Sequence, residues 1–186
     1  VLYPLAMLGI YIIIATMFRS YLQPFIILIT VPFGIIGAVC GHLLLGYDLS
    51  MMSMFGMVAL SGVVVNDAIV FIECVNTYLA KEMAFVDAIC NAGIRRFRPI
   101  LLTSLTTVGG LTPMLLEQDM QAQFLIPMAI SIAAGVAFAT VLTLLLVPSL
   151  LYILNDIRRI GHHLQTGVWL PATEVEPAYQ ENKEEA

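Results

Sequence analysis

The stretch GVVVNDAIVFIE, residues 62–73, decides the fold class because it places an acid inside a long apolar run. The run covers roughly residues 51–75 and is long enough to cross a bilayer as a helix. Within it, Asp67 follows Asn66. A carboxylate at such depth costs about 2.5–3.5 kcal/mol on insertion scales, so it indicates a proton or ion site that faces other protein. The alternative is a neutral, hydrogen-bonded packing acid. Glu73 lies near the end of the run and is predicted to be interfacial.

The composition is that of a membrane protein. Apolar residues make up 60% of the 186 residues and charged residues only 11%, whereas a soluble domain has about 25% charged residues. The net charge of −5 comes mostly from residues 174–186, which carry five Glu and one Lys. No basic patch that would bind nucleic acid is present in the sequence. We therefore predict a polytopic chain that folds as a helix bundle in lipid.

The predicted fold is all-α, with five transmembrane helices and one cytoplasmic surface helix. Polar turns with Pro, Gly and charged residues separate the apolar runs. The predicted spans are residues 1–18, 24–46, 51–76, 99–116 and 124–155, the surface helix is 80–97, and a mostly disordered cytoplasmic tail covers 156–186. In the second span, Gly37 and Gly41 are four residues apart, a spacing that lets helices approach closely in lipid.

The surface helix is predicted from its amphipathic pattern. Apolar or small residues recur at spacings of three and four, and the charged residues fall on other faces. The residues of the predicted apolar face are Met83, Val86, Cys90, Gly93 and Phe97. This pattern is typical of a helix that lies along a membrane surface.

Nothing in the sequence points to covalent catalysis or to a metal centre. The cysteines, at positions 40, 74 and 90, fit no metal-binding spacing, and no nucleophile–base pair or phosphate loop is readable. Cys40 and Cys74 are expected to pack in apolar surroundings, and His42 is expected at the membrane interface rather than in a ligand set. The sequence therefore predicts no catalytic residue, no metal and no cofactor.

The distribution of cations predicts the orientation. With five alternating spans, every Lys and Arg falls on one side of the membrane: Arg19, Lys81, Arg95, Arg96, Arg98, Arg158, Arg159 and Lys183. The opposite side receives Asp48, Glu117 and Asp119 and no cation. Because basic loops stay inside, the side that holds the cations and the carboxyl terminus is predicted to be cytoplasmic.

A hydroxyl in the fourth predicted span could approach the buried acid. Asp67 lies eight residues before Val75, and Thr103 lies four residues after Pro99. At ~1.5 Å per residue these spacings correspond to depths of about 12 Å and about 6 Å from the cytoplasmic end. Asp67 and Thr103 could then be joined directly or through a water. The alternative is that Thr103 bonds the backbone of its own helix, as Ser and Thr commonly do.

Four stretches of the chain resemble the carboxy-terminal membrane half, spans 8–12, of the resistance–nodulation–division (RND) efflux permeases, the AcrB-like exporters. Residues 18–24 together with Val31-Pro32 are similar to the start of the ninth span of that family, and residues 62–73 to its tenth. The segment RFRPILLTS, residues 96–104, resembles the start of the eleventh span, and residues 145–150 resemble the end of the twelfth. The resemblance covers about residues 1–159.

The resemblance implies a proton relay at named positions. In the family, the position of Asn66 is often Lys or Asn, and the Lys pairs with two carboxylates from the fourth span. The position of Thr103 belongs to the same relay, and that of Arg96 lines its cytoplasmic mouth. This sequence departs from the best-known pattern, because it has no Lys at Asn66 and has an acid at Asp67, where Asn is common. The predicted relay is therefore Asp67, Asn66, Thr103 and Arg96.

The function implied is proton-coupled antiport of drugs or other hydrophobic compounds across the bacterial inner membrane, driven by the proton motive force. The implied partners are the N-terminal half of the same permease, two further copies in a homotrimer, a periplasmic adaptor, an outer-membrane channel and membrane lipid. Because Val1 lies inside an apolar stretch, the chain is expected to be a piece of a longer protein. Two alternatives remain: an orphaned fragment or membrane interaction protein without transport, and an RND relative for lipid or protein export.

Overall fold

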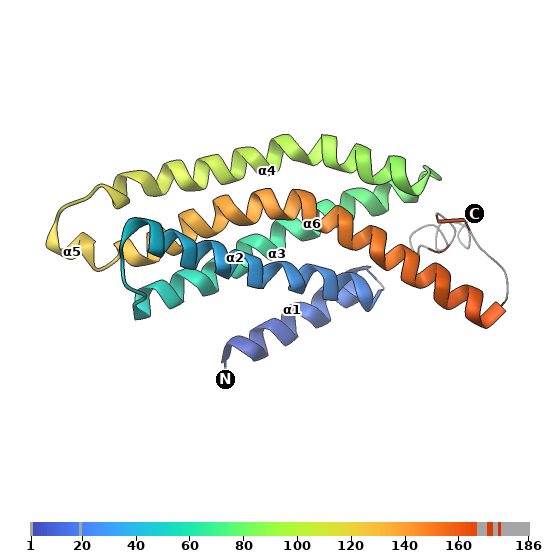
Figure 1. Cartoon of the computed structure of the whole chain (residues 1–186), viewed down its shortest axis with the longest axis horizontal. Coiled ribbons are helices and arrows are strands. Elements are labelled where there is room, and N and C mark those ends of the chain that lie inside the picture. The colour runs from blue at the N-terminus through green and yellow to red at the C-terminus, as the bar shows by residue number, and fades with distance from the viewer. Residues whose placement is uncertain (1, 19, 167–170, 173–174, 176–186) are drawn as a thin grey trace.

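The computed structural model of the chain describes residues 2–18, 20–166, 171–172 and 175, and its regular structure in these residues is entirely helical. The helices are α1 Leu2–Phe18, α2 Leu22–Leu45, α3 Met51–Leu79, α4 Phe85–Leu115, the one-turn α5 Met120–Gln123, and α6 Ile126–Thr166. Figure 1 shows α2, α3, α4 and α6 side by side along the long axis, with α1 against one flank. The predicted all-α class is confirmed.

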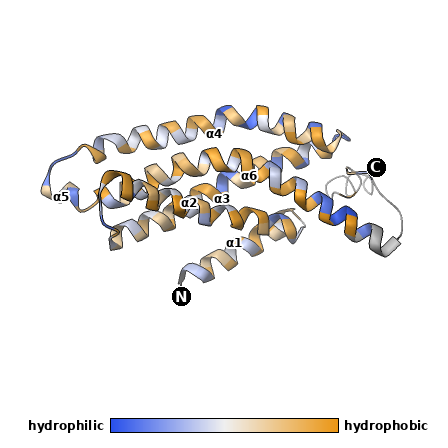
Figure 2. Cartoon of the chain, viewed as in Figure 1, coloured by the Kyte–Doolittle hydropathy of each residue, from blue (hydrophilic) through white to orange (hydrophobic). Residues whose placement is uncertain are grey.

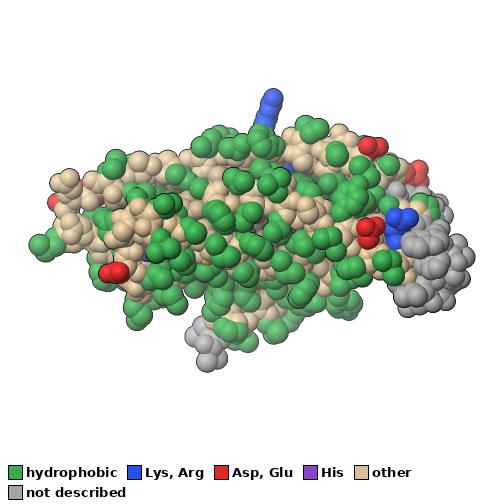
Figure 3. Space-filling model, viewed as in Figure 1, with side chains coloured by type: hydrophobic (Ala, Val, Ile, Leu, Met, Phe, Trp, Pro, Cys, Tyr) green, Lys and Arg blue, Asp and Glu red, His purple; other side chains and the backbone are tan. Residues whose placement is uncertain are grey.

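Among the described residues, three helices are long and apolar enough to cross a membrane: α2, α3 and the part of α6 from Ile126 to Ile160. In α1 the apolar segment Tyr3–Phe18 is shorter. Helix α4 carries its charges in its first half, which leaves only its second half apolar. Figure 2 shows the apolar stretches along the bundle, and in Figure 3 hydrophobic side chains cover most of the visible face. The chain is a membrane protein with apolar helical spans, and five spans remain a prediction.

The predicted surface helix 80–97 and the predicted span 99–116 are not separate, because α4 runs without a break from Phe85 to Leu115. Pro99 lies inside this helix. Proline removes one backbone hydrogen bond, but a helix in a bundle can accommodate it when neighbouring helices pack around it. Packing against α3 and α6 therefore continues the helix through a residue that, in sequence alone, marks a boundary.

The face of α4 that packs on the bundle also differs from the predicted one. Val86, Cys90 and Phe97 are exposed, and Met83 and Gly93 are half-buried. The buried residues of this part of α4 are Phe85, Ala88, Ile89 and Ala92. The two alanines let the α4 backbone approach its neighbours, while Phe85 and Ile89 supply the apolar contacts of the buried face.

Helix α6 is longer than predicted. The sequence placed the end of the last span at residue 155 and assigned 156–186 to a disordered tail, whereas α6 continues to Thr166. Arg159 lies 3.7 Å from Asp156 one turn earlier, which stabilises this extra segment slightly. Beyond Thr166 only residues 171–172 and 175 are among the described residues. One of them, Ala172, accepts a hydrogen bond of 2.8 Å from the Asn155 side chain.

Close packing between α2 and α6 depends on the two glycines predicted to allow it. A Cβ atom at Gly41 would lie 2.2 Å from the Cβ of Ala134, and a Cβ at Gly37 would lie 2.5 Å from the Cβ of Phe138. Such distances are far below ordinary contact, so only glycine permits this helix separation. In the same way, Gly135 of α6 leaves room for the side chain of Leu60 of α3.

Candidate functional site

The Asn66–Asp67 pair lies on helix α3, at the edge of a face that none of the described helices covers. Asn66 is exposed and Asp67 is half-buried, while Ala68, the next residue, is fully buried in the core. The exposed residues that continue the face along α3 are Ala59, Gly62, Glu73 and Thr77. These four are small or polar, whereas Phe55 and Val63 beside them are exposed and apolar, and nothing lies within 4 Å of a Cβ built at Gly62. Within the described residues, this strip of α3 is free for a further helix.

Contacts between α3 and α6 fix the relative depth of these two helices. Leu60 lies against Gly135, and Gly56 lies against Ser131. The two pairs have the same offset in residue number, as expected for parallel helices, and Figure 1 shows α3 and α6 running in the same direction. Each residue of α6 can therefore be assigned a level on α3.

This register brings Asp67 and Thr103 to nearly the same depth. The hydroxyls of Ser104 and Thr140 are hydrogen-bonded across the α4–α6 contact. Thr140 lies at the level of Val65 on α3, so Ser104 does too. Thr103 and Asp67 are then within about two residues in depth, roughly 3 Å. The earlier estimates from each helix end placed them about 6 Å apart, and the structure brings them closer.

The structure does not join the predicted relay residues by direct hydrogen bonds. Thr103 donates to the Ile100 carbonyl at 2.9 Å, which is the self-bonded alternative considered above. Arg96 is half-buried, and its Nε atom is shielded from solvent without a hydrogen-bond partner. Among the described residues, no hydrogen bond or ion pair connects Asp67 with Asn66, Thr103 or Arg96. Any proton path between them would need water or a group from outside this chain.

A buried polar cluster at the opposite end of the bundle was missed in the sequence. His42 was expected at the interface, but it is only 2% exposed and packs between helices. Its Nδ1 lies 3.0 Å from the Ala38 carbonyl and must donate, since a carbonyl only accepts. For the neutral ring, Nε2 then accepts from the Ser53 hydroxyl at 2.7 Å. Ser131 of α6 donates to the Ser53 carbonyl at 3.1 Å, so α2, α3 and α6 are linked.

A second polar contact lies at the cytoplasmic end predicted from the charges. Gln23 and Asn76 exchange two amide hydrogen bonds of 3.1 Å between α2 and α3. Nearby, Arg158 of α6 donates to the Ser20 hydroxyl at 3.1 Å. Neither pair could be predicted from the sequence, because hydrogen bonds between distant residues leave no periodic pattern.

The remaining polar groups do not form a metal centre. Within the part of the chain that the structure describes, no group of three His, Cys, Asp or Glu side chains could hold a metal ion. Cys74 is buried as expected, whereas Cys40 is exposed. Arg95 is hydrogen-bonded to the Tyr78 hydroxyl, and this contact raises the pKa of Arg95 above its ordinary value.

Comparison with known proteins gives the class of this bundle. The sequence profile of the AcrB/AcrD/AcrF family matches residues 1–155, so the chain belongs to this family of RND efflux transporters. Among its relatives is the swarming motility protein SwrC of Bacillus subtilis (strain 168), which is 36% identical over 151 residues. That alignment covers 81% of this chain and 14% of SwrC.

Two solved structures share the fold. One crystal form of a heavy metal efflux pump superposes with a TM-score of 0.75 at 29% identity, covering 82% of this chain and 15% of the pump. A second crystal form gives a TM-score of 0.66 at 33% identity, covering 70% of this chain and 14% of the pump. The chain therefore spans about a seventh of the length of these relatives.

Proposed function

We propose that the chain is the second half of the membrane domain of an RND exporter and that Asp67 carries protons during antiport. The single observation that supports this most directly is the position of Asp67. It is a carboxylate inside a membrane-length helix, at the edge of an uncovered polar face and level with Thr103. An acid retained at such a cost is typical of a proton site.

The uncovered face of α3 suggests where the other half of the permease packs. Glycine, alanine and polar side chains allow close approach and hydrogen bonding between helices in lipid. A helix from the N-terminal half would place its own groups against Asn66 and Asp67. In this arrangement Asp67 loads a proton from the periplasmic side and releases it toward Arg96, while Asn66 and Thr103 bind the connecting waters.

The proposed cargo is a drug or another hydrophobic compound, exported from the bacterial inner membrane by a trimer that works with an adaptor and an outer-membrane channel. This part of the proposal rests on family membership, since the chain spans only a small part of its relatives. Because one structural relative is a heavy metal efflux pump, export in the test below is measured both with a dye and with a metal ion.

The test uses Asp67→Asn in the full-length protein, because this change keeps the shape of the side chain but cannot titrate. We expect export and proton uptake in proteoliposomes to be abolished or strongly slowed, with normal assembly in the membrane. Thr103→Ala should give a partial loss. Glu73→Gln, which is exposed and lies nearly two turns nearer the membrane edge, is the matched control and should have little effect. Wild-type export by Asp67→Asn with an unchanged pH profile would make Asp67 structural.

A further inference from the structure

A groove between α4 and α6 opens onto the outside of the bundle and encloses about 550 Å³. Leu105 on one wall and Leu145 on the other are 63% and 66% exposed, which is far more than core side chains. The hydroxyls among its described lining residues belong to Ser104 and Thr140, and they bond to each other at its base. The groove therefore presents a hydrocarbon surface to any occupant.

The length and depth of the groove match one leaflet of a bilayer. About 20 residues of α3 cross the ~30 Å hydrocarbon core, so counting from the first residue of α3 puts the cytoplasmic edge near Phe71. Ser104 is level with Val65, which places Phe97 near that edge and Val108 near the midplane. The distance along α4 from Phe97 to Val108 is roughly 16 Å, about half the thickness of the core.

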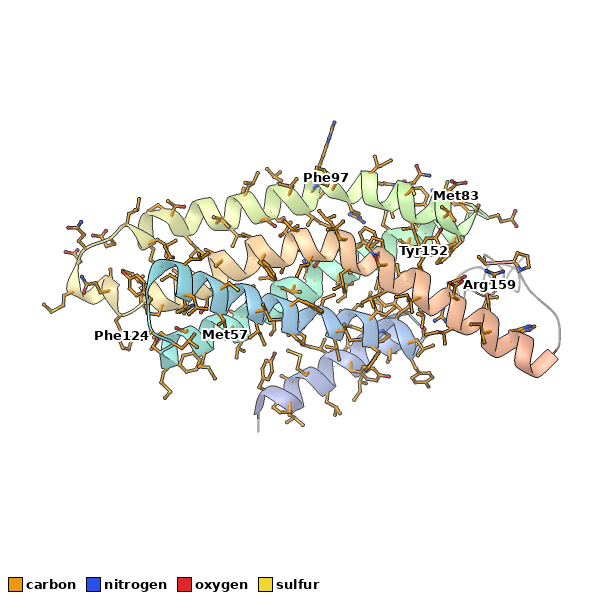
Figure 4. The ribbon with its side chains drawn as sticks, viewed as in Figure 1. Met57, Met83, Phe97, Phe124, Tyr152 and Arg159 are labelled. Carbon is orange, nitrogen blue, oxygen red and sulfur yellow. The ribbon has the colours of Figure 1, made fainter. Side chains whose placement is uncertain are left out.

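A cation on α4 lies at the depth of the cytoplasmic end of the groove. Arg98 follows Phe97 directly and is exposed, and no hydrogen bond or ion pair of its side chain occurs among the described residues. Arg95, by contrast, is bonded to Tyr78. Figure 4 marks Phe97 on α4, well separated along the bundle from Met83 at the start of the α4 region. Phospholipid phosphates lie just outside the hydrocarbon core, at the level of Arg98.

We propose that this groove binds one acyl chain of an anionic phospholipid from the inner leaflet, with the lipid phosphate held by Arg98. The proposal rests on the membrane placement in the proposed function, but not on proton transport. Apolar lining along one leaflet and an exposed cation at the depth of its cytoplasmic end are complementary to a lipid with a charged head and a long tail. A compound in transit would not need the cation at the head-group level.

Native mass spectrometry of the full-length protein in detergent tests the proposal by titration with phosphatidylglycerol and phosphatidylcholine. We expect tighter binding of phosphatidylglycerol. Arg98→Gln should weaken it roughly fivefold, the factor for one basic side chain near an anionic surface. Val108→Trp should weaken both lipids roughly tenfold, which about two displaced methylenes would explain. The matched controls are Lys81→Gln, which changes an exposed cation, and Leu43→Trp, which changes an exposed apolar residue away from the groove. Both should leave the binding of the two lipids unchanged.

A second measurement does not depend on a large substitution. Leu105→Cys, labelled with a small fluorophore in protein lacking the three native cysteines, should be quenched by phosphatidylglycerol brominated on its acyl chains. In Arg98→Gln, brominated phosphatidylglycerol should quench the label no more strongly than brominated phosphatidylcholine does. Equal binding of the two lipids by the wild type would overturn the proposal. So would a loss of phosphatidylglycerol binding in Lys81→Gln as large as the loss in Arg98→Gln. So would an unquenched label, which would mean that another part of the protein fills the groove.

Export assays distinguish a groove that binds a transported compound from a failure of the proton mechanism. If Val108→Trp stops dye export while phosphatidylglycerol binding is unchanged, the groove takes a transported compound and the lipid proposal is wrong. The lipid measurements need no proton gradient. They would therefore keep their expected outcome even if Asp67→Asn transported normally.

Discussion

Replacing Gly41 by alanine should force α2 and α6 apart. The new Cβ would lie 2.2 Å from the Cβ of Ala134, and both atoms are attached directly to helix backbones. No rotamer change can relieve this contact, so the helices must separate until the distance reaches ordinary contact. Overpacking of this kind costs about 1–3 kcal/mol. The separation would also loosen the neighbouring contact between Gly37 and Phe138.

The assay is the free energy of unfolding of the full-length protein in a titration of mild detergent with sodium dodecyl sulfate. Gly41→Ala should lower it by about 1–3 kcal/mol, and adding Ala134→Gly should restore most of the loss. Gly93→Ala is the matched control, since nothing lies within 4 Å of its Cβ position. Two results would refute the reasoning: full stability of Gly41→Ala, or a loss that Ala134→Gly does not repair.

Three further predictions concern the polar cluster, the topology and the uncovered face. Ser53→Ala leaves His42 Nε2 without its donor and should lower the unfolding free energy by about 1–3 kcal/mol. The control is Ser149→Ala, which should not change the unfolding free energy in the same titration because Ser149 is exposed and bonds its own helix. Asp119→Cys should react with an impermeant thiol reagent added from the periplasmic side; reaction only after the inner membrane is permeabilised would invert the proposed orientation. A Cβ at position 62 meets nothing within 4 Å among the described residues, so Gly62→Leu should preserve the packing of these helices while export falls, and unimpaired export would leave that face without a partner helix.

Much of the helix pattern could be predicted because apolar runs and turn residues are local signals. Helix α2 occupies Leu22–Leu45 where the sequence predicted 24–46, and α3 occupies Met51–Leu79 where it predicted 51–76. The α3 boundary is set by Ser50, whose hydroxyl accepts from the Ser53 amide as an N-cap. The prediction failed where a contact outweighed a local stop signal: Ile100, next to Pro99 inside α4, is buried, and Arg158 in the polar continuation of α6 bonds the Ser20 hydroxyl.

The candidate site shows the same division. The sequence located an acid inside a membrane-length helix, since a single charge in an apolar run is visible without any contact. It could not show whether the Thr103 hydroxyl bonds Asp67 or the backbone of its own helix, because the position of Thr103 in the sequence is compatible with both hydrogen bonds. Nor could it reveal the burial of His42, which depends on Ser53 and on the approach of α6.

The sequence by itself determined that this protein lies in lipid, that it is helical and that an acid lies inside one of its membrane-length helices. These follow from composition and from a period of 3.6 residues. The tertiary structure decided which face of α4 is buried and that Thr103 is level with Asp67. Periodicity shows which residues share a helix face, but not which face finds a neighbour. That choice depends on close contacts between residues far apart in the chain, such as Gly41 with Ala134 and Leu60 with Gly135.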